Sequence, residues 1–150
     1  MIKDFVEAKG QLHIVLRDMY GNIKEEKTVK NLVVAVGKNV IAARLQGTSM
    51  GVMTHMAVGT NAASPVSGNT ALGAEIAASR VALTVSGGTL ATNTVTYAAT
   101  FGGGVGTGAV TEAGIFSASS AGNMLCRTSF SPVNKDVSDT MSISWAVTIA

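Results

Sequence analysis

The sequence contains little of the chemistry on which disulfide-bonded proteins and metalloenzymes depend. Its 150 residues include one cysteine, two prolines and one tryptophan, and aromatic residues make up only 5% of the chain. The single Cys126 excludes an intrachain disulfide and leaves a thiolate zinc site short of ligands. Its setting, "MLCRTSF", predicts a small buried hydrophobe within a strand, a common environment for a lone cysteine.

Charge is also scarce. Charged residues make up 13% of the chain, against about 25% in an average protein, and the net charge is only +2. Eight of the eleven Lys and Arg residues and five of the nine Asp and Glu residues fall within 1–46. Nucleic-acid binding requires a basic stripe of one sign, so we expect no nucleic-acid partner. A surface with so few charges after residue 46 indicates that other subunits cover much of it.

Long apolar runs are missing as well. No segment reaches the ~18 apolar residues of a membrane span, and "MIKDFVEAKG" lacks the apolar core of a signal peptide. We therefore expect a soluble protein without a membrane partner.

Most of the chain alternates with the period of a β-strand. Segments 11–18 and 23–30 flank the turn "MYGN" and predict a charged N-terminal hairpin within residues 1–30, with the second strand at an edge or on an exposed face. Segment 31–48 changes to helical spacing, with Asn31 as a candidate N-cap and Gly47 at the C-terminal end. We predict one α-helix near residues 32–46.

After the helix, turn signals separate short strand candidates every 8–15 residues. Residues 60–69 predict a loop and residues 70–80 a short helical turn. The pattern predicts a mainly β fold, an antiparallel β-sandwich of jelly-roll or immunoglobulin-like type. We expect a single domain over residues 1–150, with the helix and the sandwich in residues 31–150. The strand candidates are 51–59, 79–87, 93–101, 108–117, 123–133 and 139–150.

The candidates for chemistry are few. His55, within "MTHMAVGTN", is interpreted as a half-buried strand residue with a local hydrogen bond, and His13 as a solvated strand residue. The glycine-rich segment 101–110, "FGGGVGTGAV", lacks the Lys of a Walker loop and the following helix of a dinucleotide site, so it predicts a hairpin tip. The four acidic residues beyond residue 46 show no spacing that favours a catalytic pair: Glu75, Glu112, Asp136 and Asp139. We therefore predict no catalytic, metal-binding or cofactor-binding residues, and no enzyme.

Several motifs, in order, resemble a known family. The stretches "NLVVAVGKNVIAARL", "MTHMAVGTNAASPVSGNTALGAEIAASRVAL", "TVTYAATFGGGVGTGAVTEAGIF" and "MLCRTSFSPVNKDVSDTMSISWAVTI" resemble small structural proteins of tailed bacteriophages. The middle part also resembles the N-terminal module of tail-collar fibre proteins. The similarity covers about residues 30–149 and implies a virion component, assembled in the host cytoplasm, without catalysis or cofactor.

The resemblance implies that the partners are other copies of the chain and virion proteins such as the major capsid protein or tail and fibre components. A capsid decoration (cement) protein is the first expectation, because the sequence ends directly after its last strand, without shaft repeats. The alternative is a tail, collar or fibre-attachment adaptor. Two other classes stay open: a host-surface carbohydrate-binding module with a groove around Trp145, Tyr97 or Tyr20, and an enzyme whose pocket would gather Glu112, His55 or Asp139.

Overall fold

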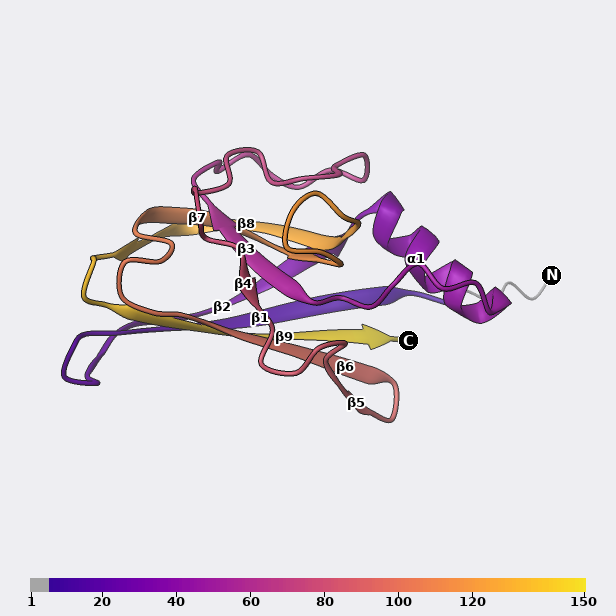
Figure 1. Cartoon of the computed structure of the whole chain (residues 1–150), viewed down its shortest axis with the longest axis horizontal. Helices are drawn as coiled ribbons and strands as arrows, with labels where there is room; N and C mark the ends of the chain where they lie inside the picture. Colours follow the sequence, from indigo (N-terminus) through magenta and orange to yellow (C-terminus); the bar gives the residue numbers. More distant parts are fainter. Residues whose placement is uncertain (1–5) are drawn as a thin grey trace.

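The computed structural model describes residues 6–150, so the first five residues of the predicted N-terminal segment lie outside the described part. Within these described residues, nine antiparallel strands form one continuous, strongly curled sheet, and a single α-helix lies at one end of the long axis (Figure 1). This confirms the predicted mainly β class with one helix. In chain order the elements are β1 (Ala8–Arg17), β2 (Ile23–Val33), α1 (Ala35–Gln46), β3 (His55–Gly59), β4 (Val81–Ala82), β5 (Thr89–Ala91), β6 (Thr94–Phe101), β7 (Gly108–Phe116), β8 (Met124–Lys135) and β9 (Thr140–Ile149).

The sheet folds over on itself at β2. The strand order is β4-β3-β7-β8-β2-β1-β9-β6-β5. β2 pairs with β1 from Ile23 to Asn31, then leaves it and pairs with β8 only at Leu32 and Val33. Its earlier part is therefore an edge that carries charged side chains, as the sequence predicted. The two halves face each other as a sandwich, half A with β1, β9, β6 and β5, and half B with β8, β7, β3 and β4.

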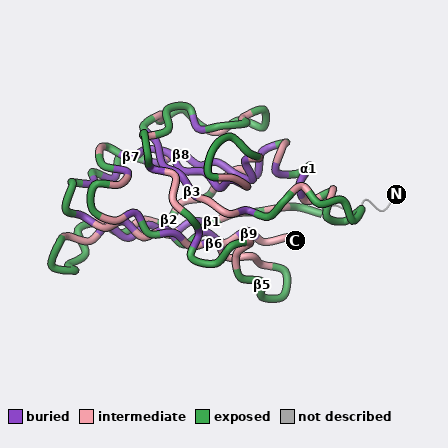
Figure 2. The backbone as a smooth tube through the Cα atoms, viewed as in Figure 1, coloured by how far each residue is buried: buried purple, intermediate pink, exposed green. Residues whose placement is uncertain are grey.

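Period-two alternation builds the core between the halves. Leu12, Ile14 and Leu16 of β1 are each at most 2% exposed, and Ile143 and Trp145 of β9 lie beside them in register. Half B contributes a second set of inward side chains, so the buried positions run along the inside of both halves while turns and loops stay exposed (Figure 2). The outward positions of β6 and β9 carry Ser, Thr and Ala.

A second apolar cluster lies on the other side of half B. Ala57, Leu72 and Phe116 belong to it, with Val34 and Met124. Figure 1 shows the long connection between β3 and β4 running over this face of the sheet. Half B is therefore covered on both faces along these segments, which explains why β7 is buried without interruption from Val110 to Phe116 and β8 from Met124 to Thr128.

The helix begins later than the sequence predicted. Asn31 is a residue of β2, the N-cap position is Val34, and no side chain caps the helix. The pairing of Leu32 and Val33 with β8 extends the strand, so the β-branched run starts as strand and not as helix. At the other end Gly47 has φ of 90° and caps the helix as expected.

Two local predictions are wrong. Residues 70–80 form turns and an isolated bridge between Gly59 and Glu75 in place of a helical turn. The glycine-rich segment is not a hairpin tip, because β6 pairs with β9 in half A whereas β7 pairs with β3 and β8 in half B. It is one of the crossovers that carry the chain between the two halves of the sandwich.

Candidate functional site

Both histidines make local contacts on strands. His55 begins β3, is half-buried, and its Nδ1 lies 2.7 Å from the Thr54 hydroxyl. This is the local hydrogen bond that the sequence predicted. His13 lies on the outward face of β1, where its Nε2 is 2.9 Å from the Glu26 carboxylate and its Nδ1 is 3.1 Å from the Thr28 hydroxyl.

The acid in β7 is a buried structural group. Glu112 is fully buried, and its carboxylate accepts hydrogen bonds from Arg127 Nε at 2.9 Å and forms an ion pair with Arg127 Nη2 at 2.8 Å. The same carboxylate accepts hydrogen bonds from the backbone N–H groups of Asn61, Gly73 and Ala74, at 3.2, 2.9 and 2.7 Å. Five donors therefore hold this acid, which fastens the β3–β4 connection to half B.

These bonds also explain why residues 70–80 are not helical. In a helix the N–H groups of Gly73 and Ala74 would need carbonyl partners or a cap. Here the carboxylate of Glu112 receives them from outside the segment. The signal in the sequence was a single acid inside the apolar run "GAVTEAGIF", a position where a charge is rare unless paired.

Arg80 forms a second set of contacts between loops. Its guanidinium pairs with Glu75 through Nε at 3.0 Å and Nη2 at 2.9 Å, and its Nη1 donates to the carbonyls of Ala118 and Ala121. The same group lies 3.8 Å from the centre of the Phe116 ring. Arg80 thus connects the β3–β4 connection with the β7–β8 loop.

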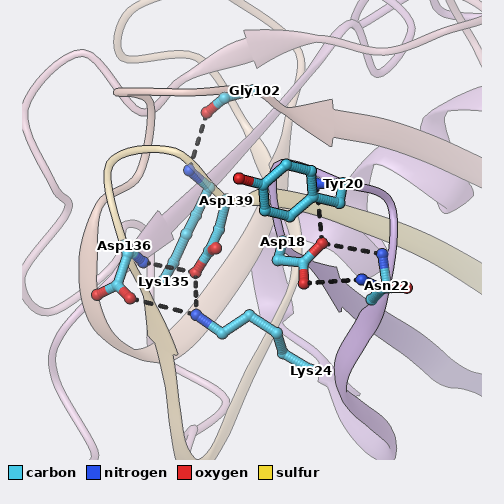
Figure 3. Close-up of polar contacts among 8 residues, drawn as sticks. All are labelled: Asp18, Tyr20, Asn22, Lys24, Gly102, Lys135, Asp136 and Asp139. Carbon is cyan, nitrogen blue, oxygen red and sulfur yellow. Dashed lines mark hydrogen bonds and ion pairs between the residues drawn. The ribbon is translucent and has the colours of Figure 1, made fainter.

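Asp136 and Asp139, in the β8–β9 turn, are brought together at the end of the molecule that carries the β1–β2 turn (Figure 3). Lys24 Nζ lies 2.7 Å from Asp139 Oδ2 and 3.2 Å from Asp136 Oδ2. Asp139 also accepts the backbone N–H of Asp136, and the buried Lys135 donates to the carbonyl of Gly102 at 2.8 Å. The cluster ties β2, the β8–β9 turn and the glycine-rich crossover into one end.

Hydrogen bonding from Lys24 holds the pKa of Asp139 below its usual value, and hydrogen bonds to Asp139 and Asp136 raise the pKa of Lys24. Both groups are therefore charged at neutral pH. A carboxylate that already accepts these bonds is an anchor, and its lowered pKa makes it a poor general base.

Cys126 and the large aromatic residues are mostly interior. Cys126 is free and buried, and burial raises the pKa of its thiol, which makes it unreactive. Trp145 is 0% exposed and Tyr97 is 8% exposed, and burial raises the pKa of Tyr97 to about 12. Of the three aromatic residues considered for a sugar-binding groove, Trp145 lies in the core, Tyr97 reaches the surface only in the wall of the pocket described next, and Tyr20 is exposed.

A small apolar pocket opens at the opposite end, between α1 and the two halves of the sandwich. We call it the socket; its volume is about 240 Å³ and its lining includes Val40, Val52, Met53, Val95, Tyr97 and Val147. Arg44 and Ile41 of α1 form part of its wall. A larger groove of about 960 Å³ adjoins it through Ile41 and Ile149 and contains Lys9, Lys30 and Lys38.

The structure does not gather the candidate groups for catalysis. Glu112 is beneath the β3–β4 connection, Asp139 is in the β8–β9 turn, and His55 is on β3; none of them lines the socket or the adjoining groove. Among residues 6–150, no group of three or more His, Cys, Asp or Glu side chains is placed to hold a metal ion. No helix within this same range is long and apolar enough to cross a membrane.

No family model matches the chain, and no curated protein and no solved structure matches it either.

Proposed function

We propose that this chain is a non-enzymatic structural protein of a tailed-bacteriophage virion, and that it is a capsid decoration protein that stabilises the head through contacts between subunits. Its partners are further copies of itself and the major capsid protein. The proposal rests on the resemblance of the sequence motifs and on the distribution of apolar surface described next.

The single observation that carries an assembly role is the exposure of large apolar side chains at both ends of the sandwich. Met19, Tyr20, Ile23 and Val137 are 55–81% exposed at one end. At the other end Leu45 is 86% exposed and Leu90 is 71% exposed. Grouped apolar side chains of this size are typical of protein–protein contact sites.

The buried charges support the same role. Glu112 with Arg127, and Asp139 with Lys24, are engaged in fastening loops to the sheet. Such contacts hold the loops rigidly against the sheet, which suits a part that must keep its shape in a shell.

A tail, collar or fibre-attachment adaptor is the alternative location for the same kind of contact. Reconstruction of the particle that carries this protein distinguishes the two. Density for the sandwich distributed over the head supports decoration, and density confined to the tail vertex supports the adaptor. Purified particles that contain no copy of the chain would overturn both.

A further inference from the structure

We propose that copies of this chain associate head to tail, with the apolar tip of one copy inserted into the socket of the next. The tip is defined as Met19, Tyr20, Ile23 and Val137. The proposal rests on the assembly role above and specifies the surface and the partner, a second copy.

The tip lies on two turns that hydrogen bonds and ion pairs hold in place. Asp18 accepts the backbone N–H groups of Tyr20 and Asn22, both at 2.9 Å, which fixes the turn between β1 and β2. Lys24 then connects β2 to Asp136 and Asp139, on either side of Val137 (Figure 3). Tyr20 is 81% exposed and Met19 is 66% exposed on this fixed turn, so little loop order has to be gained on docking.

The socket has the complementary shape and chemistry. Its volume of about 240 Å³ exceeds the roughly 150 Å³ in which a benzene-sized ring fits. Its lining is mainly aliphatic and aromatic, with the hydroxyl-bearing Tyr97 among the apolar side chains. It therefore accepts one aromatic or thioether side chain, the two kinds that the tip presents.

The charges around the two surfaces favour the same pairing. One cation, Arg44, lies in the socket wall, and Lys30 and Lys38 lie in the adjoining groove. Among the described residues that line these two surfaces the one acid is Glu7, which is paired with Lys9 at 3.2 Å. At the tip the side chain of Asp136 is 77% exposed beside Val137. Asp136 and Asp139 share the single ammonium group of Lys24, so these three side chains together carry one net negative charge. That charge approaches the cationic rim when the tip enters the socket.

The geometry also dictates the kind of assembly. The β1–β2 turn and the α1 end lie at opposite ends of the long axis (Figure 1). In an end-to-end contact the tip of one copy meets the socket of the next, so two different surfaces meet and the interface is heterologous. Such an interface closes into a ring or continues as a chain, depending on the rotation between copies.

The test uses one broken surface at a time. In the tip variant, Met19→Ser combined with Tyr20→Ser, both side chains that fit the socket are lost and the socket stays intact. In the socket variant, Val52→Lys, a cation blocks a socket wall residue that is 46% exposed, and the tip stays intact. Each variant alone is expected to be monomeric by analytical ultracentrifugation at concentrations where the natural chain associates. Val66→Ser is the matched control, because Val66 is an exposed apolar residue outside both surfaces, and it should associate like the natural chain.

Mixing the two broken variants gives the decisive result. One intact tip and one intact socket remain between them, so a 1:1 complex should form that neither variant forms alone, and it should weaken as salt is raised. Circular dichroism of each variant checks that it is folded. The head-to-tail contact is overturned if the mixture forms no complex, or if either variant on its own associates as the natural chain does. The location of the chain in the virion is tested separately, by reconstruction of the particle.

Discussion

At the scale of single residues, the important ones are the few charges that the sandwich buries. Glu112 and Arg127 are both almost completely buried and paired, and Glu112 also receives three backbone N–H groups. Removing one member of a buried pair leaves the other without a counter-charge, which costs far more than the pair contributes as a whole.

Glu112→Gln should therefore lower the free energy of unfolding by about 3–5 kcal/mol. The matched control is Glu75→Gln, which breaks the more exposed pair with Arg80 and should cost less than about 1 kcal/mol. Chemical denaturation of both variants measures the difference. Equal losses would show that burial is not what makes the Glu112 carboxylate important.

The Lys24–Asp139 pair predicts a dependence of stability on pH. Because the folded pKa of Asp139 is lowered, its contribution is present above the ordinary carboxyl pKa and is lost as pH falls through the lowered value. The pKa of Lys24 is raised, so its own contribution is fully present throughout the acid range.

Asp139→Asn should consequently lower the melting temperature at neutral pH. As pH falls, the melting temperature of this variant should decline less steeply than that of the natural chain. Asp136→Asn is the control, because that side chain is 77% exposed and should change the acid decline little. Thermal melts between neutral pH and about pH 2 measure both, the lower limit lying below the ordinary carboxyl pKa. An unchanged acid slope in Asp139→Asn would contradict the assignment.

At the scale of elements, the helix depends on a close approach to the sheet. Gly37 is buried in α1, and a Cβ atom there would overlap the carbonyl of Leu125 in β8. The helix axis can approach β8 this closely only because residue 37 has no side chain.

Gly37→Ala should destabilise the protein by about 1–3 kcal/mol through this overlap, although alanine favours helix by about 1 kcal/mol. The control is Gly68→Ala, where the added Cβ meets no atom within 4 Å and φ is not positive. That change should be neutral or slightly stabilising. Urea titrations compare the two, and a stabilised Gly37→Ala would mean that α1 does not pack as described.

At the scale of the whole molecule, the two ends of the described chain lie next to each other. Glu7 and Ala150 exchange backbone hydrogen bonds of 2.8 and 2.7 Å, and β1 pairs with β9 along its full length in the middle of half A. The fold therefore depends on contacts between residues far apart in sequence, which are made late and slow folding.

A circular permutant should retain the fold. Joining Ala150 to Val6 through a short Gly/Ser linker, and opening the chain between the exposed Ala63 and Ser64, breaks no strand. Opening between Ser144 and Trp145 instead cuts β9 and should abolish cooperative unfolding. Thermal melts followed by circular dichroism compare the two permutants; loss of the cooperative transition in the first would contradict the central role given to the β1–β9 pairing.

The sequence by itself determined the class of fold, the N-terminal hairpin, most strand positions and the presence of one helix, because alternation and turn residues are local properties that each segment carries. It also predicted the buried Cys126 and the local hydrogen bond of His55. Only the tertiary structure decided that Asn31 extends β2, that residues 70–80 are held by Glu112, and that the glycine-rich segment crosses between the halves. Those three outcomes depend on which distant strand supplies the hydrogen-bond partner, and no local pattern contains that information.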